Sequence, residues 1–211
     1  MVMLGQSHTV GSPVFWRPRG FFIPKTRLGE LVWQAACYLP PELADELLDA
    51  LKSVAIIESQ LQLQVRRRDT PEQLEDYGVV SRKVITDNGA ASVVNAMRNT
   101  FELELFNYHG LGTGAAAEAA ANTTLVTELT TQYSTDNVRP TGAQSAPAAN
   151  QYQTVATITV DANVSITEHG LFSQAAAPGG TMWDRSVFTA LVLNSGDSII
   201  ATYIATITSG G

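Results

Sequence analysis

Three glycines at alternate positions, Gly110, Gly112 and Gly114, follow an apolar segment and come closest in this sequence to a nucleotide-binding motif. Glycines placed in this way let a backbone approach phosphate groups at the start of a helix. The dinucleotide-binding pattern, however, needs its third glycine further along the chain, and a phosphate-binding loop needs a Lys followed by Ser or Thr. The spacing therefore predicts a tight turn that glycine permits, and not a nucleotide site.

The histidines and the single cysteine do not form a metal-binding pattern. His8, His109 and His169 lie far from one another and from Cys37, so a metal cluster would have to be assembled wholly by the fold. One cysteine also excludes an intramolecular disulfide. We expect no metal and no cofactor.

Charged side chains interrupt two apolar segments near the C-terminus, at Glu168, His169, Asp184 and Arg185. Strand alternation falters at Glu168 and His169, which predicts a bulge that turns both side chains into a hydrogen-bond network; acid–base catalysis is the alternative. Arg185 can pair with Glu168 or Asp184, and such buried pairs commonly specify register. We interpret Glu168, His169 and Arg185 as a structural polar network and expect no catalytic residue.

A basic run at residues 66–68 raises the possibility of nucleic-acid binding, but acidic residues follow it at once, at Asp69, Glu72, Glu75 and Asp76. This pattern favours a salt-bridge patch, either solvated or between subunits. The net charge of −7 and the pI near 4.9 also argue against a broad phosphate-binding surface. We therefore expect no direct contact with nucleic acid.

The elements that must position these residues fall into three segments. Residues 1–25 combine prolines with Phe15, Trp16, Phe21 and Phe22, which prevents a regular helix and predicts an extended arm that docks on its own domain or on a neighbour. The alternative is a disordered tail, although such tails are poor in aromatic residues. Residues 26–75 are predicted to form a helical hairpin followed by a long strand around 61–65.

Residues 76–211 are predicted to form a β-sandwich domain with one inserted helix. The pattern indicates strands at 79–85 and 101–105, a helix from an N-cap near Thr86 to Met97, and loops without a core at 115–124 and 134–150. Four long strands follow, at about 152–160, 164–172, 182–193 and 199–208. The fold class is thus mainly β, an antiparallel jelly-roll-like sandwich with an N-terminal arm and helical hairpin.

The last strand carries apolar residues on both faces, with Ile199, Tyr203 and Ile207 on one face and Ile200 and Ile204 on the other. One face can fill the core, and Ile200 and Ile204 can meet a neighbouring subunit. Charged residues make up only 16% of the chain, so neutral polar residues must cover its surface. Neutral groups are dehydrated at lower cost than charges, which suits a subunit of an assembly.

No segment approaches the length needed to span a bilayer, and the N-terminus lacks the charged and apolar regions of a signal peptide. We therefore expect neither a membrane protein nor one secreted by a signal peptide. We expect the protein to assemble in the cytoplasm of a cell.

Two groups of segments resemble a family of small structural proteins from the particles of tailed bacteriophages. The first group is NYHGLGTGAAAEAA (107–120), TELTTQY (127–133) and RPTG (139–142). The second is TEHGLFSQ (167–174), GGTMWDRSVF (179–188) and NSGDSI (194–199). The resemblance covers about residues 80–211 and implies a virion component without enzymatic activity and without catalytic residues.

The leading hypothesis is a capsid decoration, or cement, protein that forms a homotrimer on the lattice of the major capsid protein, its arm and hairpin binding neighbouring subunits. A neck, tail or fibre-attachment protein of the virion is the alternative within the same class. From another class, a carbohydrate-binding module or an envelope hydrolase stays open, because jelly-roll domains often bind glycans. The candidate residues of a glycan-binding or hydrolase site are Trp183, Tyr203, Glu168 and Asp184.

Overall fold

The computed structural model describes residues 56–82 and 84–208, together with the isolated positions Pro40 and Leu43. Residues Ile57–Ile207 form one compact unit. The predicted arm (1–25), with Phe15, Trp16, Phe21 and Phe22, lies outside the described residues, and so does nearly all of the predicted helical hairpin. In the described part of the chain, no helix is both long enough and apolar enough to cross a membrane.

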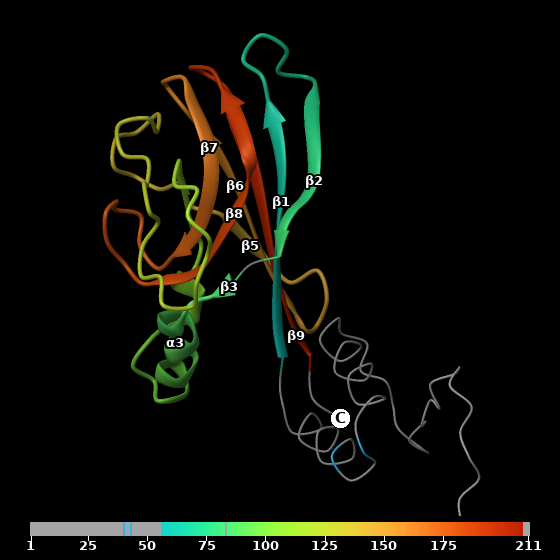
Figure 1. Cartoon of the computed structure of the whole chain (residues 1–211), viewed down its shortest axis with the longest axis vertical. Coiled ribbons are helices and arrows are strands. Elements are labelled where there is room, and N and C mark those ends of the chain that lie inside the picture. Colours follow the sequence, from blue (N-terminus) through green and yellow to red (C-terminus); the bar gives the residue numbers. More distant parts are fainter. Residues whose placement is uncertain (1–39, 41–42, 44–55, 83, 209–211) are drawn as a thin grey trace, which may run out of the picture. The chain divides into compact units, whose positions relative to one another are not determined.

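The described chain is mainly β and folds into two antiparallel sheets (Figure 1). The five-stranded sheet has the order β2-β1-β9-β6-β5, and the four-stranded sheet has the order β3-β8-β7-β4. The strands are β1 (Ile56–Arg66), β2 (Leu74–Arg82), β3 (Val84–Ile85), β4 (Tyr108–Gly112), β5 (Ala143–Ser145), β6 (Gln151–Thr159), β7 (Val164–Phe172), β8 (Met182–Leu193) and β9 (Ser198–Thr208).

Alternation of side chains explains why the two sheets share one core. In β1, Leu61, Leu63 and Val65 are fully buried, while the glutamines between them are half-buried. Because successive side chains of a strand point to opposite faces, one apolar residue in two is enough to cover the inner face. The largest apolar cluster joins residues of both sheets, Leu61 and Ile158 from one and Ile166 and Leu193 from the other.

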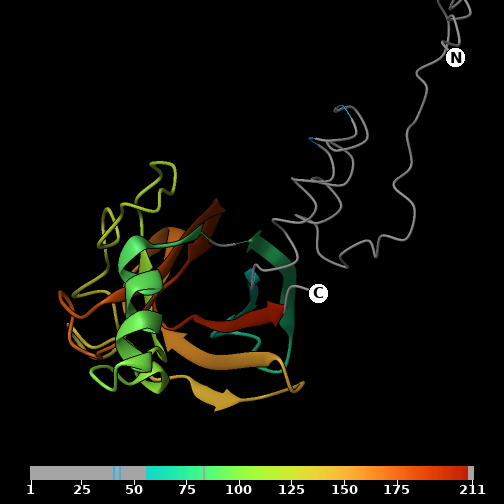
Figure 2. The same cartoon turned by 90° about the horizontal axis from the view of Figure 1, so that it is seen from below.

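The α-helix of the described residues, α3 (Asp87–Met97), begins where the sequence predicts it. The hydroxyl of Thr86 accepts a hydrogen bond from the amide of Gly89 at 2.9 Å and donates one to the carbonyl of Met182 at 2.6 Å. The N-cap therefore both starts the helix and attaches it to β8. Figures 1 and 2 place α3 at one end of the strands.

Two predicted strands are wrong. The strand expected at 79–85 consists of the end of β2 and the separate β3, which belong to different sheets. Residues 101–105, expected as a strand, instead contain a short 3₁₀ helix, η1 (Leu103–Leu105). Alternation of apolar and acidic residues does not distinguish a strand from a 3₁₀ helix at 101–105. In the structure Phe106 packs against both Phe101 and Trp183, and this packing holds the segment in a turn against α3 and β8.

The close contact between α3 and β8 leads to a stability prediction. A methyl group on Gly89 would overlap the backbone carbonyl of Trp183, which cannot move without disturbing β8. We expect Gly89→Ala to lower the free energy of unfolding by about 1–3 kcal/mol through overpacking, although Ala is the better helix former. Urea denaturation measures this. Met97→Ala on the same helix is the control, because Met97 is 83% exposed; equal stability of both variants would contradict the prediction.

Candidate functional site

A carboxylate with no access to solvent lies at the centre of the four-stranded sheet. Glu168 of β7 is 0% exposed, and the register of β7 against β8 shifts between Ile166 and Glu168, where the sequence predicts a bulge. The carboxylate accepts hydrogen bonds from the backbone amides of Gly114 (3.0 Å), Val126 (3.1 Å) and Thr127 (2.8 Å). Glu168 thereby attaches the loop after β4 to β7.

Arg185 of β8 provides the opposite charge. Its Nη2 lies 2.8 Å from Glu168 Oε2, and its Nε donates to the same oxygen at 2.9 Å. The remaining N–H groups donate to the carbonyls of Ala116 (2.9 Å) and Ala117 (3.2 Å) and to the side chain of Asn122 (3.2 Å). Of the two partners predicted for Arg185, the structure therefore pairs it with Glu168, and both groups are surrounded by protein atoms.

Gly112 and Gly114 accommodate this carboxylate, and the alternating glycines do not form the predicted tight turn. Gly110 and Gly112 lie within β4, and Gly112 pairs with Glu168 across the sheet. A Cβ atom on Gly112 or Gly114 would overlap the side chain of Glu168. The glycines are required because a backbone approaches a buried side chain closely, which sequence spacing alone does not distinguish from a turn.

The two histidines of the described residues contact each other between β4 and β7. Nδ1 of His109 in β4 lies 3.0 Å from Nε2 of His169 in β7, and both side chains are 0% exposed. His109 Nε2 lies 3.3 Å from the hydroxyl of Thr154 in β6. The histidines thus bridge the two sheets, and the described residues contain no group of three or more side chains suited to hold a metal ion.

A second buried ion pair falls in a loop that the sequence predicts to lack a core. Arg139 is 1% exposed, and its guanidinium binds the carboxylate of Glu128, with Nη2 at 2.8 Å from Oε2. Nη1 donates to the carbonyls of Gln174, Ala176 and Gly179, and the guanidinium lies 3.6 Å from the centre of the Phe172 ring. The prediction of a coreless loop is therefore wrong around Arg139, where no local sequence pattern signals burial.

The basic run at 66–68 forms ion pairs within the chain. Arg67 lies 2.8 Å from Glu75 and 3.0 Å from Asp197 in the turn between β8 and β9, and Arg68 lies 3.0 Å from Asp69. Asp197 also accepts hydrogen bonds from the amides of Arg68 and Asn194, each at 2.9 Å. The predicted salt-bridge patch therefore closes the ends of the β1–β2 and β8–β9 connections.

The outer face of the five-stranded sheet carries Ile200 and Ile204, both half-buried. Across the β6–β9 pairing, Gln153 faces Ile204, Val155 faces Thr202 and Thr157 faces Ile200. The same face of β1 presents Gln60, Gln62 and Gln64. We call these residues the neutral face, namely Gln60, Gln62, Gln64, Gln153, Val155, Thr157, Ile200, Thr202 and Ile204.

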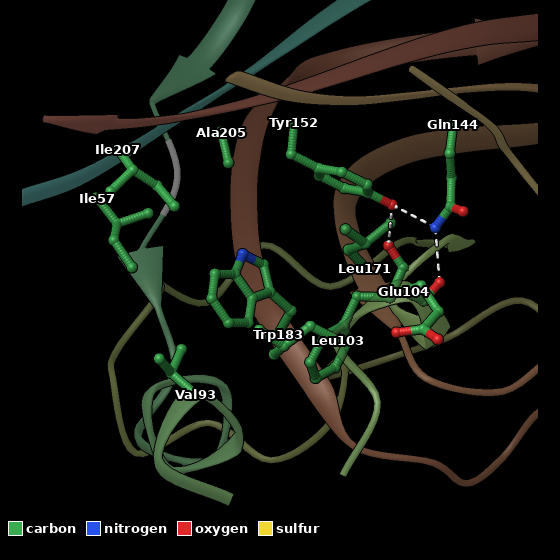
Figure 3. A pocket seen from close by; sticks show the side chains of 11 residues that line it. Ile57, Val93, Leu103, Glu104, Gln144, Tyr152, Leu171, Trp183, Ala205 and Ile207 are labelled. Atoms are coloured by element: carbon green, nitrogen blue, oxygen red, sulfur yellow. Dashed lines mark hydrogen bonds between the residues drawn. The ribbon is translucent and has the colours of Figure 1, made fainter. Parts of the chain in front are cut away.

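An apolar cavity of about 310 Å³ lies apart from the buried charges, at the end of the sheets near α3 (Figure 3). Its walls come from α3, η1 and strands of both sheets, and Figure 3 shows the indole of Trp183 between Val93 and Ala205. The sequence did not point to this cavity, because its lining residues come from segments far apart in the chain.

Comparison with known proteins adds no assignment. The chain matches no family model, and no curated protein or solved structure is significantly similar to it. Its function must therefore be argued from the geometry described above.

Loss of the Glu168 carboxylate should destabilise the fold strongly. We expect Glu168→Gln to lower the free energy of unfolding by about 3–5 kcal/mol, because it leaves the charge of Arg185 buried without a counter-charge. The matched control is Glu75→Gln, which breaks the largely solvated pair with Arg67 and should cost about 0–1 kcal/mol. Urea denaturation of both variants measures the difference, and similar losses would refute the structural role of Glu168.

The turn carboxylate of Asp197 should contribute to acid sensitivity. Burial by itself raises the pKa of Asp197, but hydrogen bonds from the amides of Arg68 and Asn194 and from Arg67 outweigh burial and lower it below the ordinary 3.8. A pKa that is lower in the folded state gives stability above about pH 4 that is lost as the pH falls through the folded value.

Asp197→Asn should therefore reduce stability at pH 7 by about 1–3 kcal/mol and weaken the further loss below pH 4. Thermal unfolding between pH 2 and 7 measures both effects. Asp69→Asn is the control, because the side chain of Asp69 is 82% exposed. An unchanged acid profile in Asp197→Asn would contradict the assignment.

Proposed function

We propose that the chain is a non-enzymatic structural protein of a tailed-bacteriophage particle, and specifically a capsid decoration protein that binds the major capsid lattice as a homotrimer. The observation that carries the proposal is the neutral face, which has no acid or base in β6, in β9 or between Glu58 and Arg66 of β1. The resemblance of residues 80–211 to phage virion proteins supports the same conclusion. The two sheets around one core suit a jelly-roll-like sandwich.

The neutral face is suited to burial against another protein. Amide and hydroxyl side chains cost less to dehydrate than charges, and their hydrogen bonds can be remade across an interface. Ile200 and Ile204 add apolar area at its centre, on the strand flanked by β1 and β6. The charged residues of this side of the sheet lie at its borders, with Glu58 and Arg66 at the two ends of the β1 stretch and with Arg82 and Asp76 opposite Gln60 and Gln64 on the edge strand β2.

The sheet edges favour association through this face over strand addition. At one edge, β5 has three residues, and at the other, β2 carries Glu75, Asp76 and Arg82. Short and charged edge strands are poor templates for pairing with a further strand. The partner of the chain therefore packs onto the neutral face, and the edges stay free of intermolecular pairing.

The buried polar residues support a role without catalysis. Glu168 and Arg185 are saturated by protein groups, and both hold loops to the four-stranded sheet. A catalytic carboxylate needs a free position for the substrate or for a water molecule. The envelope-hydrolase alternative therefore loses Glu168, one of its two candidate acids.

The glycan-binding alternative also loses its aromatic platform. Trp183 is 8% exposed and donates from Nε1 to the hydroxyl of Tyr203 at 2.6 Å, and Tyr203 itself is fully buried. Tyr203 offers no open face for stacking on a sugar, and Trp183 lines the apolar cavity and not an exposed platform. A neck, tail or fibre-attachment role would use the same neutral face with a different partner, so stoichiometry separates it from decoration.

Copy number in the particle tests the proposed role. Quantitative mass spectrometry of purified virions should give about one copy per major capsid subunit, or one trimer per local three-fold position. A few copies per particle would instead assign the chain to the neck, tail or fibres. Absence from the particle would refute the virion role.

A charge introduced into the neutral face should weaken association without unfolding the domain. We expect Ile204→Lys to reduce binding to undecorated capsids at least tenfold, about 1.4 kcal/mol, because the ammonium group must be dehydrated at the interface. Val192→Lys is the matched control, a lysine in place of an exposed β-branched residue of β8, which is 64% exposed. Co-sedimentation with capsids measures binding, and equal binding by the two variants would exclude the neutral face as the interface.

A further inference from the structure

The apolar cavity near α3 belongs to the compact unit Ile57–Ile207, which contains all of its lining residues. Trp183 and Leu171 are buried in its wall, whereas Leu103 and Ile207 are 38% and 51% exposed, so the cavity opens beside them. Its volume of about 310 Å³ is at the low end of ordinary binding pockets. A dry cavity of about 150 Å³ already binds benzene, so this one has room for two fused aromatic rings with a short side chain.

The hydrogen-bond donors on the side chains around the cavity are already engaged. Trp183 Nε1 donates to the hydroxyl of Tyr203 at 2.6 Å, and the hydroxyl of Tyr152 donates to the carbonyl of Phe106 at 2.7 Å. Gln144 Nε2 donates to the hydroxyl of Tyr152 at 2.9 Å and to the carbonyl of Glu104 at 2.6 Å, as Figure 3 shows. An anionic group in the cavity would therefore lose its hydration without gaining a donor from these side chains.

The margin of the cavity carries a negative charge. Among the lining residues, all of which lie in the described part of the chain, Glu104 is acidic and none is basic. The side chain of Glu104 is exposed, and its backbone carbonyl is bound by Gln144 at one side of the cavity (Figure 3). A cationic head group on a ligand would find an acceptor and an opposite charge here, whereas an anionic one would be repelled.

We propose that this cavity is a binding site for small arylalkylamines, whose rings enter the cavity while the ammonium group stays at the margin beside Glu104. The aromatic side chains of the wall favour such a ligand, because aromatic rings pack well in tilted pairs and their faces attract cations. Phe106 and Trp183 already form such a pair, with ring centres 5.2 Å apart and planes tilted by 49°. The inference goes beyond the virion role and does not rest on it, because it concerns the isolated chain.

Methyl NMR of the full-length chain, titrated with three naphthalene probes, tests both the site and the ligand class. The probes 2-(1-naphthyl)ethylamine, 2-(1-naphthyl)ethanol and 1-naphthylacetate share one ring system and carry a cationic, a neutral and an anionic head. The amine should shift the methyl signals of Ile57, Leu103, Leu171 and Ile207 saturably and leave that of the core residue Leu61 unchanged. At low salt it should bind about fivefold more tightly than the acetate, because an exposed charge pair contributes modestly.

Each other result of the titration would overturn the proposal. A lack of saturable shifts, or shifts at methyl groups away from the cavity, would exclude the cavity as a binding site. Equal or tighter binding of the acetate would exclude the amine as the ligand class.

Removal of the charge at the margin tests the role of Glu104. Glu104→Gln should abolish the preference for the amine over the acetate and leave the affinity for the neutral alcohol unchanged. Glu72→Gln is the matched control, because Glu72 is exposed and lies outside the cavity, and it should keep the preference. A preference that persists in Glu104→Gln would refute the contact with the carboxylate.

Filling the cavity tests the site independently of charge. Ala205→Leu should weaken all three probes about tenfold, because its added atoms take the space that the rings need. Val93→Phe fills the same cavity from α3, so the test does not depend on a single variant being folded. Ala91→Leu, at an exposed position of α3, is the control and should bind as the unchanged chain does. Circular dichroism checks folding, and full affinity in a folded filling variant would refute the proposal.

Discussion

The ion pair between Glu168 and Arg185 is the interaction on which the rest of the four-stranded sheet depends. Two charges without solvent contact cost several kcal/mol each to dehydrate, and their attraction offsets this only if every remaining donor and acceptor is satisfied. The chain meets this condition with three backbone amides on the carboxylate and two carbonyls and an asparagine on the guanidinium. Residues 114–127 are held in place by this requirement, since that segment contributes few buried apolar side chains.

Arg139 applies the same solution to a second stretch of irregular chain. Its guanidinium gathers three carbonyls and the carboxylate of Glu128, and thereby joins residues 128–139 to the loop between β7 and β8. Loops rich in Ala, Ser and Gly cannot bury enough apolar area to offset the entropy of ordering them. Arg139 and Arg185 are buried and each make several hydrogen bonds, which supply the missing contacts. These hydrogen bonds explain how the weakly hydrophobic loops are ordered.

Charge is thus distributed in an unusual way, with ion pairs inside and at the strand ends and a neutral face outside. The interior pairs fix loops, the Arg67–Asp197 contact fixes turns, and the neutral face is left to Gln, Thr, Ile and Val. Neutral side chains lower the cost of dehydrating this face, which is the basis of the proposed role in an assembly.

Local periodicity was enough to predict much of the fold. The alternation in 61–65 and in the four C-terminal strands, the cap at Thr86 and the bulge near Glu168 all depend on neighbours within a few residues, and the sequence records these directly. It also singled out Glu168 and Arg185, since charged residues in apolar strands must find partners.

The partners themselves were decided by tertiary structure: amides from residues 114–127, the pairing of His109 with His169, the burial of Arg139 and the cavity around Trp183. Each joins segments far apart in the chain, and no local pattern encodes which backbone groups will converge. The 3₁₀ turn at 103–105 shows the same limit, because packing of Phe101 and Phe106 near Trp183 overrides an alternation that is typical of a strand.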